Sequence, residues 1–267
     1  MFLRTLPPAR PRSSQLATNL IAIGILLTGA GNAFSQSNQC TVSSGAHITP
    51  VIELYTSEGC SSCPPADKWA STFKDKVKNG GAVVQAFHVG YWDQLGWVDR
   101  FAAPAYTSRQ RDIAAKNKLR NIYTPQAVMN GKDWPNWAQG TPSGASPEPA
   151  RASIALKQLA SDQYEASVTS LPGASSPTSW SAYWTVTEHG HQSKVQAGEN
   201  SGELLKHDFV VRQYTQAGDY TTAAGAPQKL QWRSIAATPG HPRQVNLVVF
   251  ETQTGKTLQA VSLQCPA

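Results

Sequence analysis

The sequence predicts an α/β domain with a helical insertion, followed by a smaller all-β, sandwich-like domain. In the first half of the 267 residues, apolar strand-like runs alternate with helical segments, as in a sheet covered by helices. In the second half, about six short runs of alternating residues are separated by polar turns, which is typical of a β-sandwich. A Cys-x-x-Cys motif, Cys60 to Cys63, directly follows the first predicted strand.

The first half is predicted to alternate strands with helices. The expected order is a strand over 50–56, a helix over 64–78, a strand over 82–89, a helix over 104–119, a strand over 126–129 and a short helix over 149–160. Pro64 and Pro65 are compatible with the first turn of a helix, where proline is tolerated. Asn130 and Gly131 form a hairpin-turn signal after the third strand.

The second half changes character near Gln163, where we place a domain boundary. Strands are expected over 164–168, 180–186, 207–214, 229–235, 243–251 and 257–263. The predicted domains are therefore residues 34–162 and 163–267, preceded by a leader over residues 1–33.

The leader has the parts of a secretory signal peptide. Arg4, Arg10 and Arg12 precede an apolar core over 20–27, and small residues follow up to Ala33. The core is about half of the roughly 20 residues that a transmembrane helix needs, which favours cleavage over the alternative of an uncleaved membrane anchor. We therefore expect a periplasmic or secreted protein without stable membrane insertion after cleavage.

Cleavage also changes the charge of the chain. The full chain has 23 basic and 17 acidic residues, a net charge of +6, and the loss of three arginines leaves 20 basic residues and a net charge of +3. This modest charge favours solubility and gives no support to nucleic acid as a partner.

Four cysteines in an exported protein allow three disulfide pairings. Cys60 and Cys63 are the local pair, which leaves Cys40 to pair with Cys265 near the C-terminus. Closing so long a loop stabilises the fold by about 5 kcal/mol at most in the chain-entropy model. We expect this second bridge to be structural, so that the local pair is free for another role.

The Cys60–Cys63 pair is predicted to be a thiol–disulfide redox site, because it lies where a strand ends and a helix begins. Free backbone N–H groups and the positive end of the helix dipole favour a thiolate there. Cys60 would attack a substrate, and the more buried Cys63 would resolve the mixed disulfide. The alternatives are an inert structural disulfide and a metal site, for which tetrahedral zinc would want four ligands.

Thr124 and Pro125 supply a second signal, since a proline directly before a strand can adopt a cis bond and shape a groove facing the cysteines. With the Cys-x-x-Cys motif and the Asn-Gly turn, these residues resemble the thioredoxin superfamily. The resemblance implies a thioredoxin-like fold, with Cys60 as nucleophile, Cys63 as resolving residue and Pro125 as cis-proline. The long separation between the two motifs implies that residues 92–119 carry the helical insertion.

Longer stretches resemble a more specific family of exported bacterial proteins, known as domain of unknown function 1223. They are the segments 51–67, Phe87-His88-Val89, Tyr91-Trp92-Asp93, Leu95-Gly96-Trp97 and 123–126. This resemblance covers most of the mature chain and implies the same fold, but it assigns no activity.

Three polar residues near the motif have distinct expected roles. Glu53, seven residues before Cys60, is either a proton relay or a hydrogen-bonded structural acid. Glu58 is expected to be an exposed loop charge. His88 ends the second strand and is expected to be satisfied by a neighbour such as Asp93, although it could also tune a thiolate or bind a metal with the cysteines.

The sequence thus predicts an exported thiol–disulfide oxidoreductase that needs no cofactor. Its expected partners are protein thiols or disulfides in the cell envelope. Two alternatives stay open, a non-catalytic binding module in which the local disulfide is a clasp, and a copper or zinc carrier that uses Cys60, Cys63 and His88. The expected catalytic residues of the first hypothesis are Cys60, Cys63, Thr124, Pro125 and Glu53.

Overall fold

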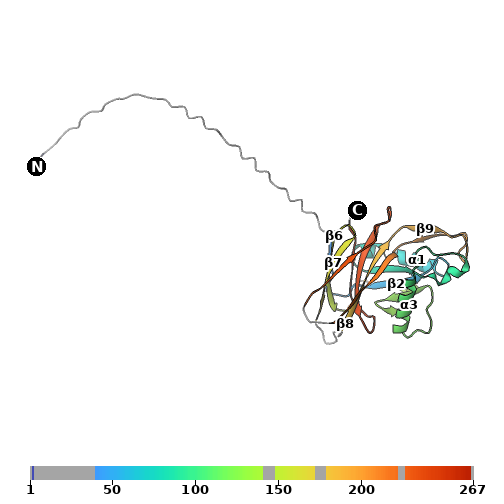
Figure 1. The fold of residues 1–267 in the computed structure, drawn as a ribbon, viewed down its shortest axis with the longest axis horizontal. Helices are drawn as coiled ribbons and strands as arrows, with labels where there is room; N and C mark the ends of the chain where they lie inside the picture. The colour runs from blue at the N-terminus through green and yellow to red at the C-terminus, as the bar shows by residue number, and fades with distance from the viewer. Residues whose placement is uncertain (1, 3–39, 141–147, 172–178, 222–225, 266–267) are drawn as a thin grey trace, which may run out of the picture. The chain divides into compact units, whose positions relative to one another are not determined.

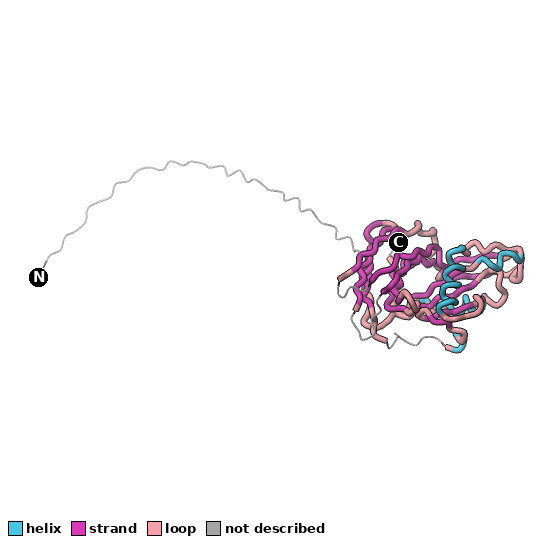
Figure 2. Tube along the Cα trace, turned by 60° about the horizontal axis from the view of Figure 1, so that its bottom comes forward, coloured by secondary structure: helices cyan, strands magenta, loops and turns pink. Residues whose placement is uncertain are grey.

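The computed structural model describes residues 2, 40–140, 148–171, 179–221 and 226–265. From Cys40 onward these residues belong to one compact unit, whereas the predicted signal peptide over 1–33 lies outside the described residues except for Phe2. Most of the unit is β-sheet, and the helices gather at one end of it (Figure 1 and Figure 2). Within the described ranges, no helix is long and apolar enough to cross a membrane.

A long mixed sheet forms the centre of the unit, with the strand order β14–β13–β8–β11–β3–β2–β4–β5. β2 and β11 run parallel to β3, and the other neighbours are antiparallel. The strand bounds are β2 Val51–Thr56, β3 Val83–His88, β4 Gln126–Met129, β5 Lys132–Asp133, β8 Ser179–Glu188, β11 Val210–Thr221, β13 Arg243–Glu251 and β14 Thr257–Leu263.

A second, antiparallel sheet packs against the β14–β13–β8 part of the long sheet. Its order is β1–β6–β7–β12, with β1 Thr41–Ser43, β6 Ala152–Ala160, β7 Gln163–Ser170 and β12 Gln228–Arg233. Apolar side chains from both sheets fill the space between them, and the rings of Trp184 and Trp232 stack with centroids 5.2 Å apart. Burial of these side chains stabilises the pairing of the two sheets.

Helices cover both faces of β2 and β3. α1 (Pro64–Ser71) and α2 (Lys74–Lys78) pack on the face that carries Ile52 and Leu54. α3 (Pro104–Lys116) packs on the opposite face, against Tyr55 and Phe87. Because both faces are covered, every residue of β2 and β3 is buried. Two short 3-10 helices span Gly90–Leu95 and Trp137–Gln139.

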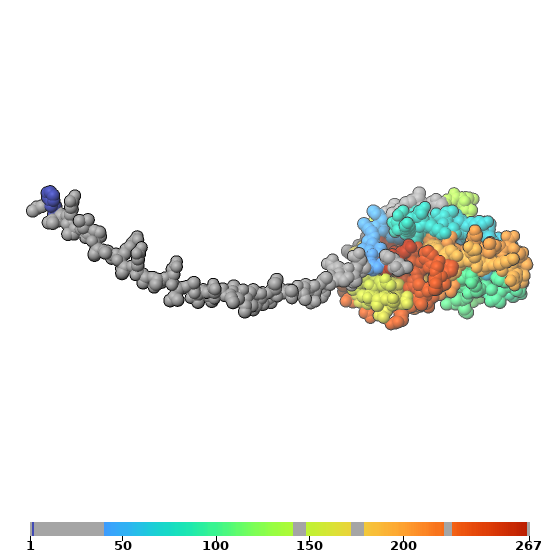
Figure 3. Space-filling model, turned by 90° about the horizontal axis from the view of Figure 1, so that it is seen from above, coloured from blue at the N-terminus to red at the C-terminus, as the bar shows by residue number. Residues whose placement is uncertain are grey.

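A separate two-stranded hairpin lies beside α1. It consists of β9 (His191–Lys194) and β10 (Leu204–His207), and Figure 3 shows its orange surface next to the turquoise surface of the segment that contains α1. The loop over residues 195–203 joins the two strands and reaches the Cys-x-x-Cys motif. We call this segment the capping loop.

The predicted α/β thioredoxin-like domain with a helical insertion is wrong. β11 pairs with β3, through Val210 and Ala86, and thereby joins β8, β13 and β14 to β2 and β4 in one mostly antiparallel sheet. The smaller sheet likewise combines β1 and β6 from the first half with β7 and β12 from the second. The physical reason is that strand pairing is long-range, and the local pattern of each half carries no information about its partner strands.

Residues 149–160, predicted as a short helix, instead contain strand β6. Ala152, Ile154 and Leu156 are buried between the two sheets, whereas the residues between them are more exposed. This period of two is that of a strand. The alternation of helices and strands earlier in the chain favoured a helix here. The alternation of buried and more exposed residues within the segment indicates a strand instead. The predicted helix over 64–78 also divides, at residues 72–73, into α1 and α2.

Two other local predictions are confirmed. Asn130 and Gly131 both have positive φ, +51° and +80°, and connect β4 to β5 in a two-residue hairpin turn. Cys40 and Cys265 form a disulfide across a sequence separation of 225 residues, which joins the residue before β1 to the segment after β14.

Candidate functional site: a covered disulfide and a buried polar cluster

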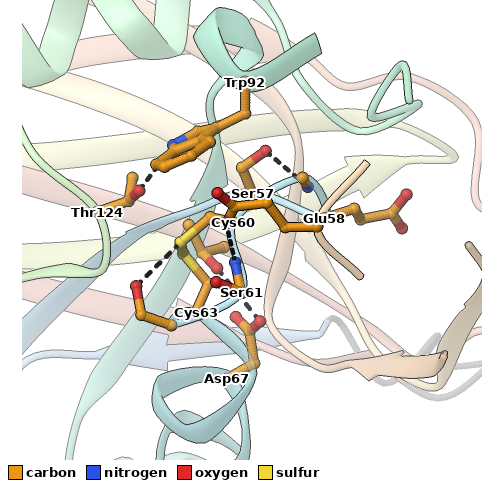
Figure 4. The surroundings of a disulfide bond; sticks show 12 residues. Ser57, Glu58, Cys60, Ser61, Cys63, Asp67, Trp92 and Thr124 are labelled. Atoms are coloured by element: carbon orange, nitrogen blue, oxygen red, sulfur yellow. Dashed lines mark hydrogen bonds between the residues drawn. A yellow bond between two sulfur atoms is a disulfide. The ribbon is translucent and has the colours of Figure 1, made fainter. Parts of the chain in front are cut away.

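The Cys60–Cys63 pair forms a disulfide in the turn between β2 and α1, as predicted (Figure 4). The N–H of Cys63 donates to the carbonyl of Cys60 at 3.2 Å, and α1 begins at Pro64. The disulfide therefore lies at a helix N-terminus, whose dipole favours a thiolate after reduction. The first two helical residues are prolines, which have no N–H, and the next two N–H groups donate to the carbonyl of Cys63. Both cysteines are 0% exposed, so neighbouring segments cover them completely.

Trp92 and Thr124 form one side of this cover. The indole N–H of Trp92 donates to Oγ1 of Thr124 at 2.8 Å, and Figure 4 shows both side chains on one side of Cys60. Gly59 permits the close approach, because a Cβ there would lie 2.9 Å from Cβ of Trp92. The peptide bond between Thr124 and Pro125 is cis. Thr124 thus lies near the motif, while the catalytic roles of Thr124 and Pro125 stay predictions.

The capping loop forms the other side of the cover. The side-chain amide of Asn200 donates to the carbonyl oxygens of Glu58 at 2.8 Å and Cys60 at 3.0 Å. The carboxylate of Glu199 accepts a hydrogen bond from the N–H of Ser61 at 3.0 Å, across 138 positions of sequence. No signal in the sequence could have connected this loop to the motif, because the contact depends on the fold.

A groove of about 720 Å³ lies between α1 and β10, beside the capping loop. Ser61 and Glu199 line it at the motif, and Asp67 and His207 line it from the buried side. A molecule that enters this groove reaches the edge of the Cys-x-x-Cys turn.

Five titratable residues form a buried polar cluster next to the disulfide: Glu58, Asp67, His88, Asp99 and His207. Nδ1 of His88 lies 2.7 Å from Oδ2 of Asp99, which also accepts the N–H of Glu58 at 2.9 Å. Nε2 of His207 lies 3.2 Å from Oε1 of Glu58, and its Nδ1 lies 3.9 Å from Oδ2 of Asp67. The two imidazole rings are 4.9 Å apart, so the cluster is continuous.

Burial and mutual contact shift the pKa values of the titratable residues in this cluster, in different directions for different residues. Burial raises the pKa of Asp67, and the two nearby histidines only partly offset that effect. Burial also disfavours ionised Asp99 and protonated His88, but their contact outweighs it, so the pKa of Asp99 is lowered and that of His88 is raised. In Glu58, contacts with His207 and with Trp97 outweigh burial and lower the pKa. Asp67 is therefore the cluster's acid with a raised pKa.

One expectation about this region is wrong, and a second, that a neighbouring acid contacts His88, is confirmed with a different partner. Glu58 is completely buried instead of being an exposed loop charge, and the indole N–H of Trp97 donates to its Oε2 at 2.7 Å. The partner of His88 is Asp99 instead of Asp93, whose own carboxylate accepts the N–H of Asp99 at 3.1 Å.

Glu53 lies apart from the buried polar cluster. Its carboxylate faces α3, where it accepts hydrogen bonds from the guanidinium of Arg109 at 2.9 and 2.7 Å. The hydroxyls of Tyr55 and Tyr183 donate to the same carboxylate. Thr56, whose hydroxyl donates to Asp67 at 3.2 Å, faces α1 on the other side of the sheet. Of the two roles open to Glu53, these contacts favour the structural acid.

The metal alternative gains no support from side-chain geometry. Among the described residues, no group of three or more His, Cys, Asp or Glu side chains is arranged to hold a metal ion. The sulfurs of Cys60 and Cys63 are bonded to each other, and Nδ1 of His88 contacts Asp99.

Of the five cluster residues, Asp67 could have been found from its spacing in the sequence. It follows Cys63 by four positions at the start of a helix, so both residues project from the same helix face. Asp99 and His207 come from segments distant in sequence, and no local pattern marks them as neighbours of the cysteines.

The fold and the site define a mostly β protein with a covered Cys-x-x-Cys disulfide at a strand–helix junction. A family model described as "Protein of unknown function (DUF1223)" matches residues 51–251, and the chain belongs to this family. The expected family resemblance is thereby confirmed. A comparison with curated proteins gives no match.

Two solved structures have a similar fold. Protein AGR_C_4864 from Agrobacterium tumefaciens has a TM-score of 0.59 and 21% identity, over 82% of this chain and 96% of that chain. HBP35 of Porphyromonas gingivalis has a TM-score of 0.52 and 10% identity, over 82% of this chain and 76% of that chain. These identities show a shared fold alone.

Proposed function

We propose that this protein is an exported thiol–disulfide oxidoreductase whose Cys60–Cys63 pair exchanges with protein thiols or disulfides of the cell envelope. The observation that carries the proposal is the position of the disulfide, at the N-terminus of α1 and one helical turn before the buried acid Asp67. The two disulfides also support a periplasmic or secreted location, because such bonds persist in oxidising compartments.

Exchange proceeds in two nucleophilic displacements at sulfur. The Cys60 thiolate attacks one sulfur of a substrate disulfide, and the other substrate sulfur leaves as a thiolate. Cys63 then loses its proton and attacks Cys60, which releases the second substrate thiolate and forms the Cys60–Cys63 disulfide. The substrate gains two electrons and the cysteine pair loses two. A substrate dithiol reduces the pair by the same steps in reverse.

Asp67 is well placed to take the proton of Cys63. It lies one turn after Cys63 on α1, it is buried, and Thr56 donates to its Oδ2 at 3.2 Å. Because burial raises its pKa, its carboxylate binds a proton more readily than an exposed acid does. His207, which lines the groove, lies 3.9 Å from Asp67 and offers a route for the proton to solvent.

Replacing Asp67 with asparagine is expected to slow the attack of Cys63 by about tenfold or more, since positioned acid–base groups contribute roughly 10²–10⁴-fold. Asparagine has the same shape and can still accept from Thr56, so the fold is kept. The measurement is the rate of reoxidation of reduced protein by oxidised glutathione across pH. The wild-type rate is expected to rise with pH as Asp67 ionises.

The reoxidation rate of the Asp67→Asn variant is expected to lack the rise with pH that ionisation of Asp67 causes in the wild type. Asp75→Asn, which removes an exposed acid on α2, is the matched control and should behave like the wild type. An Asp67→Asn variant with the wild-type rate and profile would rule out the proton transfer.

Turnover of a disulfide substrate tests the proposed function itself. The mature chain is expected to accelerate reduction of insulin disulfides by dithiothreitol, or oxidation of a reduced peptide, and the Cys60→Ser variant to do neither. If the wild type never exceeds Cys60→Ser at any redox poise, the proposal fails.

A second candidate function is favoured by the complete burial of both cysteines. Thiol–disulfide exchange needs access of the partner to a sulfur atom, whereas a covered disulfide suits a clasp in a non-catalytic binding module. The two candidates differ in reactivity. A redox site is reduced by a dithiol while the protein stays folded, and a clasp resists reduction until the capping loop or the whole fold opens.

A further inference from the structure

The capping loop brings a carboxylate to the Cys-x-x-Cys turn itself. Oε2 of Glu199 accepts a hydrogen bond from the N–H of Ser61, the residue directly after Cys60, at 3.0 Å. Neither Ser61 nor Ser62 carries a charge, so the motif holds no charged side chain of its own between its cysteines. The charge that acts on the motif at this point comes from a different part of the chain.

We propose that Glu199 shifts the redox equilibrium of the Cys60–Cys63 pair toward the disulfide. After reduction, the Cys60 thiolate is stabilised by the positive end of the α1 dipole and by hydrogen-bond donors of the 60–63 turn. The N–H of Ser61 is already engaged by Glu199, and the negative carboxylate disfavours a second negative charge beside it. Glu199 thus acts as a positioning and tuning residue, and its biological role rests on the proposed function.

The surrounding contacts hold Glu199 in this position. Its neighbour Asn200 is buried and donates to two carbonyl oxygens of the motif segment. The N–H of Gly202 donates to the carbonyl of Val195 at 2.9 Å, which closes the capping loop. The hydrogen bond from Ser61 lowers the pKa of Glu199, so that its carboxylate is ionised at neutral pH.

The hydroxyl of Ser62 acts in the opposite direction. Its oxygen lies 3.4 Å from Sγ of Cys60, close enough for the hydroxyl to donate to a thiolate. The two serines of the motif therefore have different roles: Ser62 supports the thiolate, and Ser61 is the point at which Glu199 acts on it.

The test compares Glu199→Gln with the wild type in the mature chain, with the Cys40–Cys265 disulfide intact. Glutamine can still accept from Ser61, so the variant removes the charge and keeps the geometry. Each protein is equilibrated with reduced and oxidised dithiothreitol. One dithiothreitol gives two electrons and two protons to the Cys60–Cys63 disulfide and becomes its own cyclic disulfide.

The expected result is a shift of about two- to fivefold in the equilibrium constant toward the Cys60–Cys63 dithiol, as for other exposed charge contacts. The pKa of Cys60 in the reduced protein, followed by thiolate absorbance, should fall. Because Glu199 is exposed, both differences should shrink at high salt. Glu199→Asp, which keeps the charge, should stay near the wild type.

Glu203→Gln is the matched control, because it removes the same charge from the same loop without a contact to the motif. The inference is overturned if Glu199→Gln and Glu203→Gln give the same equilibrium constant and the same pKa of Cys60. Both readouts need no protein substrate, so they separate this inference from the proposed function. A chain without turnover can still show the effect of Glu199, and an active one can lack it.

Discussion

Replacement of Glu53 with alanine is expected to destabilise the folded chain by about 3–5 kcal/mol, because it leaves the buried Arg109 guanidinium without its partner. The two side chains are 3% and 10% exposed, so solvent offers little compensation. Tyr183 also loses its acceptor, since its hydroxyl donates to Glu53 at 3.1 Å. The measurement is the free energy of unfolding from urea titration. The slope of that free energy against urea concentration is compared between variants, because an unchanged slope means that stability alone has changed.

The double variant Glu53→Ala with Arg109→Met is the control for this prediction. Removal of both charges should restore part of the stability, since a buried ion pair contributes little over apolar side chains of similar size. A Glu53→Ala variant with wild-type stability and slowed thiol exchange would contradict the structural role. It would favour the alternative of a proton relay.

Replacement of Cys63 with serine is expected to abolish turnover and to trap mixed disulfides at Cys60. Without the resolving thiol, the first displacement at sulfur occurs and the second cannot. The mixed disulfide between Cys60 and the substrate therefore accumulates. The measurement is the mass of the species formed when the variant is incubated with a protein disulfide and separated without reductant. The helix N-terminus at Pro64 is unchanged in the variant, so Cys60 keeps its activating environment.

Two further variants complete this experiment. Cys60→Ser should trap far less, because Cys63 is the resolving residue of the proposed mechanism, whereas the Ser62 hydroxyl lies 3.4 Å from Sγ of Cys60 and supports its thiolate. Cys60→Ser with Cys63→Ser should trap nothing. Equal trapping by the two single variants would contradict the assigned roles, and no trapping by either would favour the clasp.

The sequence was sufficient for features that depend on near neighbours. The local disulfide follows from the spacing of Cys60 and Cys63, and the β4–β5 hairpin follows from Asn130 and Gly131. The Cys40–Cys265 bridge follows from counting, since no other cysteines remain. Strands also form at or near each range predicted in the second half, although the range 207–214 divides between the end of β10 and the start of β11.

The features that the sequence could not supply depend on contacts between distant segments. The pairing of β11 with β3 turns two predicted domains into one continuous sheet, and no period in either strand specifies that partner. Glu58 was expected to be exposed because a charged loop residue usually is, but Trp97 and His207 enclose it. Asn200 and Glu199 reach the motif only because the β9–β10 hairpin folds beside α1.

The covered disulfide is the point on which the account depends. A structural clasp and a redox pair have the same bond and differ in the free energy needed to reduce it. Burial of Cys60 and Cys63 favours the clasp, whereas the helix N-terminus and the buried acid Asp67 favour the redox pair.

The most direct test is the reduction potential of the Cys60–Cys63 pair in the folded protein, with the Cys40–Cys265 disulfide left intact. We expect a potential above about −300 mV, in the range of pairs that exchange with cellular thiols. A potential well below about −300 mV would contradict it, since such a pair resists reduction and serves as a structural clasp.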